Sequence, residues 1–130
     1  MHEQDDMRRS PIIAVALLML AACGGGSTAA PTPELDPAAA QGLGVFNRNC
    51  AACHALSPDT VIVGPSLARI AARASDRLPD LDARAYVEMS ILKPSAYIVQ
   101  GFSDVMPKDF GKKLTGEELD ALVAFLLTLQ

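Results

Sequence analysis

The chain has 130 residues, a formal net charge of −4, four Phe, two Tyr and no Trp. This length holds at most one domain of ordinary size, and so few large apolar side chains build only a small core, which a large flat cofactor could complete. The negative charge argues against nucleic acid as a partner, because the basic residues are spread out and form no patch that could neutralise phosphates.

The first predicted element is a signal peptide at residues 1–22. Residues 7–23 run from a basic start through an apolar stretch to a small-residue end, which is the order of a secretory signal. The apolar run at 12–22 is shorter than the roughly 20 residues of a membrane-spanning helix. A short buried helix is the alternative. The residues before Met7 are acidic, so the true translation start could be Met7.

The end of that signal, Leu-Ala-Ala-Cys at 20–23, resembles the bacterial lipobox. The resemblance implies that Cys23 is lipidated and becomes the first mature residue, which would account for an odd third cysteine. More than one acyl chain gives stable membrane anchoring. Residues 24–40 are rich in Gly, Ala and Pro and predict a flexible tether. We therefore expect an exported lipoprotein, anchored through Cys23 and facing the periplasm or the outer side of the cytoplasmic membrane.

An alanine-rich helix is predicted next, over residues 38–50. It contains Gly42 and Gly44, each of which lowers helix stability by roughly 1 kcal/mol relative to alanine. Glycines placed inside a helix indicate close backbone contact with another element.

The residues Cys50, Cys53 and His54 form the pattern C-x-x-C-H, the attachment signature of c-type haem. Two thiols can add to the two porphyrin vinyl groups, and the adjacent His54 is then placed to bind the iron. A thioredoxin-like pair would need a preceding strand, but no β-branched run precedes Cys50. A zinc site needs four ligands, and a Cys50–Cys53 disulfide would close too small a loop to stabilise much. The pattern predicts one covalent haem c.

The sequence Gly64-Pro65-Ser66-Leu67 predicts a stiff loop. The second ring nitrogen of a ligating histidine normally donates to a carbonyl group, and the Pro65 carbonyl is a candidate acceptor. The signal is weak alone, because Gly-Pro occurs in many turns. Arg69 and Arg73 follow, one helical turn apart, and would either face haem propionates or form a solvated helix face.

A second helix is predicted over residues 82–92, with Asp82 as its cap and Pro94 shortly after its end. Its Met89 is expected to pack against the core. Met106 lies instead in a loop between glycines and is followed by Pro107, which stiffens it. A thioether as sixth iron ligand raises the reduction potential. We predict His54 and Met106 as the axial ligands; simple packing of Met106 in its loop is the alternative.

The last predicted helix covers residues 114–129. Thr115 and Glu118 have the spacing of a capping box, and Leu119, Leu122, Val123 and Leu126 fall on one helical face. No stretch alternates as a strand. We expect an all-α domain at residues 41–130, with three to four helices around one haem.

Residues 38–130 resemble a class I c-type cytochrome. In that family a glycine and an aromatic residue precede the first cysteine by eight and four positions, which here are Gly42 and Phe46, and they cross the last helix near Phe125. The family's histidine, Gly-Pro-x-Leu and late methionine correspond to His54, residues 64–67 and Met106. Residues 90–129 are also similar to the cytochrome c domain fused to some haem–copper oxidase subunits II, although this chain lacks the copper-binding portion.

These features predict a monohaem, membrane-anchored carrier of single electrons and not an enzyme. Its partners would be respiratory or photosynthetic redox proteins, such as an oxidase, a reductase or a photosynthetic complex. One alternative is a bound cytochrome subunit of a larger complex. Another is a haem-based gas sensor or peroxidase, in which Met106 would be displaceable; no distal acid–base group is evident for it.

Overall fold

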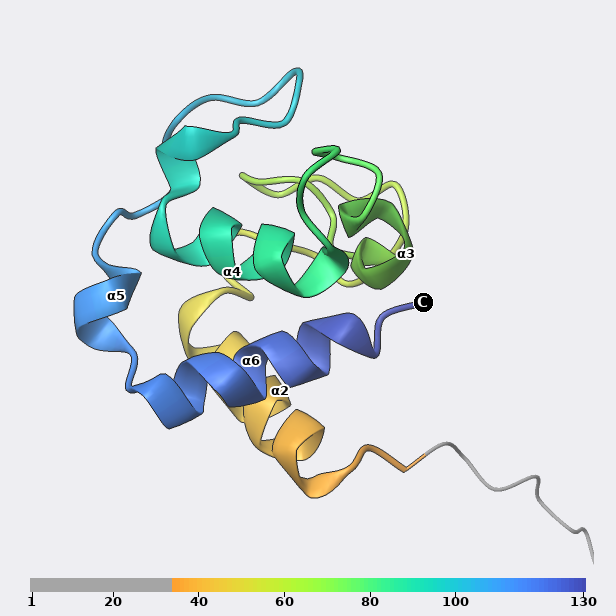
Figure 1. Ribbon diagram of the computed structural model, residues 1–130, viewed down its shortest axis with the longest axis vertical. Coiled ribbons are helices and arrows are strands. Elements are labelled where there is room, and N and C mark those ends of the chain that lie inside the picture. Colours follow the sequence, from red (N-terminus) through yellow and green to blue (C-terminus); the bar gives the residue numbers. More distant parts are fainter. Residues whose placement is uncertain (1–33) are drawn as a thin grey trace, which may run out of the picture. The chain divides into compact units, whose positions relative to one another are not determined.

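The computed structural model describes residues 34–130; the signal segment, Cys23 and most of the predicted tether lie outside them. The described chain is helical and contains no strand, which confirms the all-α prediction (Figure 1). Its elements are α2 (Pro37–Asn49), α3 (Ile70–Ala74), α4 (Ala83–Leu92), the 3-10 helix η1 (Pro94–Ala96), α5 (Phe110–Lys113) and α6 (Gly116–Leu127). Within residues 34–130, no helix is long and apolar enough to cross a membrane.

Helix α2 begins at Pro37 because Asp36 caps it. The Asp36 carboxylate accepts hydrogen bonds from the N–H groups of Ala38 and Ala39, and Pro37 has no N–H to satisfy at the first helical position. Residues 37–40, which composition assigns to the tether, are therefore helical.

Helices α2 and α6, the first and last helices of residues 34–130, cross each other (Figure 1). Gly42 meets the backbone of Ala121 and the Cβ of Phe125 at the crossing. The rings of Phe46 and Phe125 pack beside it with their centroids 5.7 Å apart. The contact predicted between these two helices is confirmed, and it fixes the end of α2 on which the cysteine motif begins.

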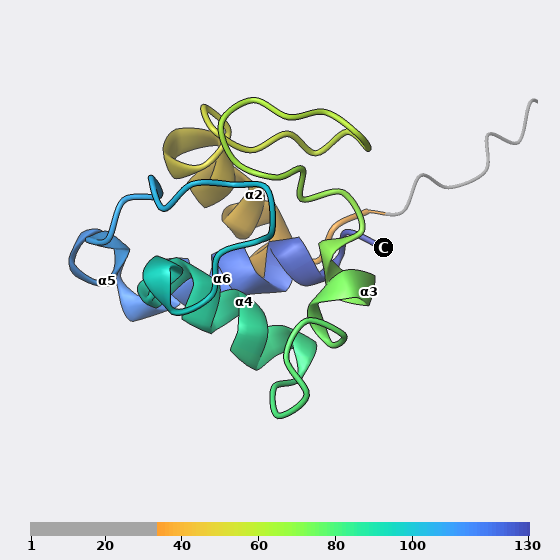
Figure 2. The ribbon, with the colours of Figure 1, turned by 90° about the horizontal axis from the view of Figure 1, so that it is seen from above.

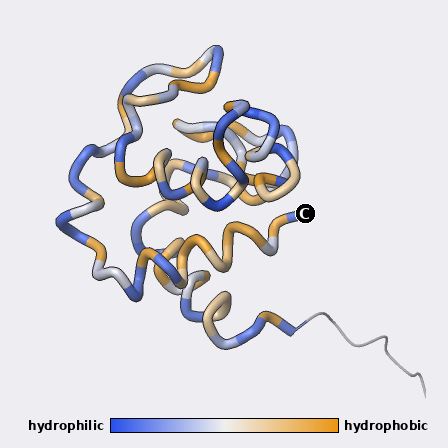
Figure 3. Tube along the Cα trace, viewed as in Figure 1, coloured by the Kyte–Doolittle hydropathy of each residue, from blue (hydrophilic) through white to orange (hydrophobic). Residues whose placement is uncertain are grey.

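The predicted helix starts are also confirmed. Thr115 and Glu118 form a reciprocal capping box at α6, and the Asp82 carboxylate accepts from the Ala85 N–H at the start of α4. Helix α6 is hydrophobic over most of its length (Figure 3), and its Leu122, Val123 and Leu126 are buried. The same core takes Tyr86, Val87 and Ile91 from α4.

Long loops cover one side of α4 and α6. Figure 2 shows the loop that follows α2 and the loop that precedes α5 on that side. Both contribute side chains to a single cavity, whose floor comes from α4 and α6.

Candidate functional site

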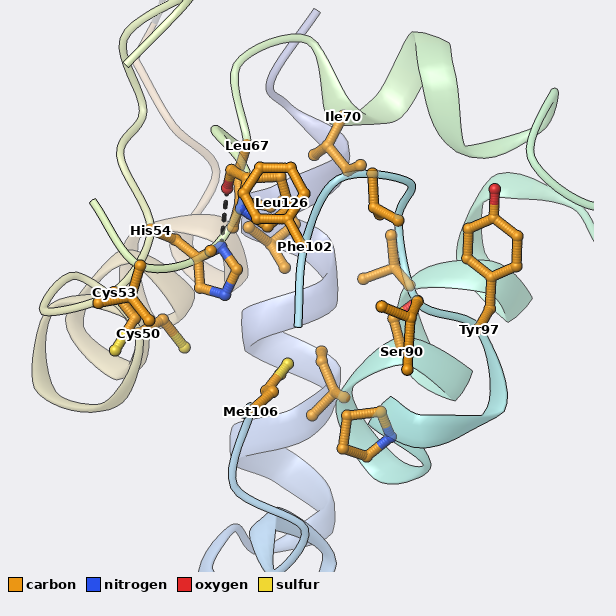
Figure 4. A pocket seen from close by; sticks show the side chains of 18 of the residues that line it. Cys50, Cys53, His54, Leu67, Ile70, Ser90, Tyr97, Phe102, Met106 and Leu126 are labelled. Atoms are coloured by element: carbon orange, nitrogen blue, oxygen red, sulfur yellow. Dashed lines mark hydrogen bonds between the residues drawn. The ribbon is translucent and has the colours of Figure 1, made fainter. Parts of the chain in front are cut away.

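The cysteine motif continues α2 by one more turn. The Cys50 N–H donates to the Phe46 carbonyl at 2.8 Å, and the Cys50 carbonyl accepts from the N–H groups of Cys53 and His54, both at 3.0 Å. Positions three and four apart on a helical turn lie on the same side. The backbone therefore gathers two thiols and one imidazole at the edge of the cavity, as Figure 4 shows.

The His54 ring is oriented by the loop opposite. Its Nδ1 lies 2.8 Å from the Pro65 carbonyl oxygen, so the predicted acceptor is confirmed. A carbonyl can only accept, so this hydrogen bond places the ring proton on Nδ1 and leaves the lone pair of Nε2 free. An imidazole held in this tautomer is prepared to bind a metal through Nε2.

Gly64 allows the loop to pass directly against the imidazole. A Cβ built on Gly64 would overlap the His54 ring and lie 2.9 Å from each ring nitrogen. The close approach is held by two backbone hydrogen bonds, from the Gly64 N–H to the Cys53 carbonyl at 2.9 Å and from the Leu67 N–H to the Ala55 carbonyl at 2.8 Å. Glycine is therefore required here by space.

Met106 enters the same cavity from a different loop (Figure 4). Its side chain is half-buried and packs against the hydrophobic core. Met89 does not line the cavity and packs against the core instead, as predicted. The structure thus brings Cys50, Cys53, His54 and Met106 to one space.

The walls of this cavity are mostly apolar and come from every part of the domain. The apolar lining residues from the loops and helices include Leu67, Ile70, Tyr86, Val87, Ile91, Tyr97, Val99, Phe102, Phe110, Leu122 and Leu126. Sequence reasoning identified the cysteines, the histidine and the methionine of the site but not this lining, because the lining residues come from several helices and loops that only the folded chain brings together.

A few polar groups also face the cavity. The Arg73 guanidinium donates to the carbonyls of Ser66 and Ala68 at 2.8 and 2.7 Å, while its buried Nε has no partner within the described chain. Arg77 lies beside it in the lining, and Arg69 does not reach it. The two arginines therefore do not form one solvated helix face. Arg73 lines the cavity and is hydrogen-bonded there, whereas Arg69 precedes α3 with a left-handed backbone (φ 56°).

Burial, reinforced by the neighbouring Cys53, raises the pKa of the Cys50 thiol to about 11. Near neutral pH Cys50 is thus a protonated thiol. Cys50 and Cys53 form no disulfide within residues 34–130.

The cavity opens between two loops that expose apolar side chains. Val61, Ile62 and Val63 precede the Gly64-Pro65 turn, and Ile98 and Val105 lie in the segment between η1 and α5; all five are exposed. Val63, Ile98 and Val105 also line the cavity and so mark its mouth.

The residues present fit a covalently bound haem. Free thiols stand three positions apart, an imidazole has its Nε2 available, and a thioether enters from another loop. The wall suits an apolar macrocycle, and the unpartnered Arg73 Nε is a donor that a propionate carboxylate would match.

An all-α fold that collects a C-x-x-C-H motif and a loop methionine around an apolar cavity defines a c-type cytochrome domain. The chain belongs to the family described as cytochrome c oxidase, cbb3-type, subunit III, whose model matches residues 37–126. Membership makes the domain a haem c protein and an electron-transfer module. No curated protein matches the chain.

Proposed function

We propose that this protein is a membrane-anchored monohaem cytochrome that carries single electrons, with haem c attached at Cys50 and Cys53. His54 and Met106 are its axial ligands in this proposal. One observation carries it: the two side chains enter the same apolar cavity from separate loops, with the cysteine pair on the His54 side (Figure 4).

Bound haem supplies the redox chemistry, in which the iron alternates between ferric and ferrous states. The chain's own residues hold that iron in one environment. Pro65 fixes the His54 tautomer, and Gly64 lets the loop close against the ring. Arg73 and Arg77 line the cavity and would be the residues that neutralise the haem propionates. Ligands that stay bound in both oxidation states keep reorganisation small, which favours fast transfer.

We expect Met106→Ala to convert the ferric protein from low spin to a form with an open sixth position. The test is the visible spectrum of the full chain, produced with haem-attachment machinery and purified in both oxidation states. The native protein should show a low-spin ferrous c-type spectrum and, when ferric, a weak far-red sulfur-to-iron band that the substitution abolishes. Met89→Ala is the matched control and should keep the band, because Met89 lies outside the cavity.

A native spectrum that is high-spin, or that changes on adding carbon monoxide, would instead favour the gas sensor or peroxidase. A far-red band that survives in Met106→Ala would rule out Met106 as the ligand. A colourless protein would contradict haem attachment at Cys50 and Cys53.

The proposed anchor rests on the resemblance of residues 20–23 to a lipobox. In this proposal residues 1–22 are the signal peptide, and residues 23–40 comprise the lipidated Cys23 and the tether to the folded domain. The protein would then face the periplasm or the outer side of the cytoplasmic membrane. Respiratory or photosynthetic redox proteins would be its partners.

The family description, an oxidase subunit, supports a second candidate, a cytochrome held in a larger oxidase or reductase complex. The resemblance to the cytochrome domain of some oxidase subunits II points the same way. Both candidates share the site chemistry and differ in what retains the protein at the membrane.

Cys23→Ser separates the two candidates. We expect the native chain in the membrane fraction and at least a tenfold shift of Cys23→Ser to the soluble fraction, because acyl chains provide most of the binding free energy at roughly 0.8 kcal/mol per buried CH₂. A Cys23→Ser protein that stays in the membrane fraction, and that co-purifies with oxidase subunits after solubilisation, would support the complex. The fractions are compared by haem absorbance.

A further inference from the structure

The loop that carries Met106, residues 101–109, has few polar connections to the rest of the domain. Two of its backbone hydrogen bonds are local, from Phe102 to the Val99 carbonyl and from Val105 to the Ser103 carbonyl. Among residues 34–130, the contacts between Ser95 and Asp104 are the only hydrogen bonds that join residues 103–108 to another element. Without the connection to Ser95, this loop would position the Met106 thioether only loosely.

The connection is made by one carboxylate with two donors. The Ser95 hydroxyl donates to Asp104, with its oxygen 3.0 and 2.9 Å from the two carboxylate oxygens. Lys108 Nζ donates to Asp104 Oδ2 at 3.0 Å.

The two donors fix different parts of the site. Ser95 belongs to η1, which follows α4 directly and begins at the buried Pro94, so it is a fixed point on the body of the domain. Lys108 and Asp104 stand two residues after and two residues before Met106. Their ion pair links the two sides of the loop segment that contains Met106. The hydrogen bonds from Ser95 connect this segment to η1.

We propose that Asp104 is a positioning residue for Met106, holding the loop so that the thioether resists displacement from the iron by other ligands. The proposal rests on His54/Met106 ligation as proposed above. A thioether is a weak ligand, so its affinity for the iron depends strongly on the conformational entropy that the loop loses when Met106 binds. Fixing the loop in advance reduces that entropic cost.

The test measures imidazole binding to the ferric, haem-loaded full chain, followed by loss of the far-red band. Asp104→Ala should bind imidazole about fivefold more tightly than the native protein, the upper range for a solvent-exposed charged contact. Ser95→Ala, which removes only the tie to η1, should give a smaller increase. Ser95→Thr keeps the hydroxyl and should restore native affinity.

Glu88→Gln is the matched control. It removes an exposed i,i+4 ion pair of the same kind, Arg84–Glu88 at 2.8 Å on α4, at a residue outside the cavity. Its imidazole affinity should equal that of the native protein. Guanidinium unfolding midpoints recorded for all variants separate a general loss of stability from a specific loss of the hold on Met106.

Imidazole affinities of Asp104→Ala and Ser95→Ala within a factor of two of native would overturn the positioning role while leaving His54/Met106 ligation intact. An equal increase in Glu88→Gln would also overturn it. If Asp104→Ala fails to load haem, Ser95→Ala alone decides the matter. A native protein without a Met106-dependent far-red band would overturn both proposals.

Discussion

Replacing Gly42 with alanine is expected to destabilise the folded domain by about 3 kcal/mol, at the upper end of the usual range for overpacking. The new Cβ would overlap the Ala121 carbonyl oxygen and lie 2.7 Å from the Phe125 Cβ. The obstacle is partly the backbone of α6, so it cannot rotate away. Alanine gains roughly 1 kcal/mol in helix propensity over glycine, so the clash decides the sign.

Gly44→Ala is the matched control and should have the opposite effect. It lies on the same helix, but its Cβ would meet only the end of the Arg48 side chain, at 3.5 Å. We expect it to stabilise the domain by roughly 0.5–1 kcal/mol. Guanidinium unfolding of the haem-loaded protein, followed by circular dichroism, measures both. A Gly42→Ala protein as stable as Gly44→Ala would contradict this account of the helix crossing.

The second large effect is expected for Gly64→Ala, at the ring of His54. The added Cβ would stand within 2.9 Å of both ring nitrogens, so the imidazole must turn away or the loop must withdraw. Either movement breaks the hydrogen bond from Nδ1 to the Pro65 carbonyl. Loss of such an orienting partner typically weakens metal binding by about 10–100-fold. We expect a mostly high-spin spectrum and a low haem content per chain.

Gly111→Ala provides the comparison, because its Cβ would be in ordinary contact with Leu92 at 3.6 Å. Its haem content and spectrum should match the native protein. Haem absorbance per protein mass and the ferrous spectrum measure both variants. An unchanged low-spin spectrum in Gly64→Ala would show that His54 does not ligate the iron in the orientation described.

The sequence was most informative where a local rule applies. The caps at Asp82 and Thr115 depend only on a side chain and the N–H groups of the next turn. The contact between α2 and α6 followed from the family resemblance at Gly42, Phe46 and Phe125. The hydrogen bond from His54 to Pro65 followed from the chemistry of ligating histidines.

Other features could not be predicted because they depend on how the loops pack. Helices α3 and α5 have five and four residues, too short for apolar periodicity to identify them. The Ser95–Asp104 contact joins exposed polar residues nine positions apart, and no spacing rule predicts such a pair. The left-handed backbone at Arg69 is uncommon for a residue other than glycine, and the sequence does not indicate it.

The crossing of α2 and α6 also joins parts of the chain that are made at different times. Arg48 and Glu118, which pair across it, are 70 positions apart, and Cys50 follows α2 directly. A chain that emerges from its N-terminus exposes Cys50 and Cys53 before α6 is present, so the crossing cannot yet form around them. In the folded domain Cys50 is half-buried. The crossing therefore cannot enclose the motif until the last helix has formed, and a variant in which the two helices docked sooner would expose both cysteines for a shorter time.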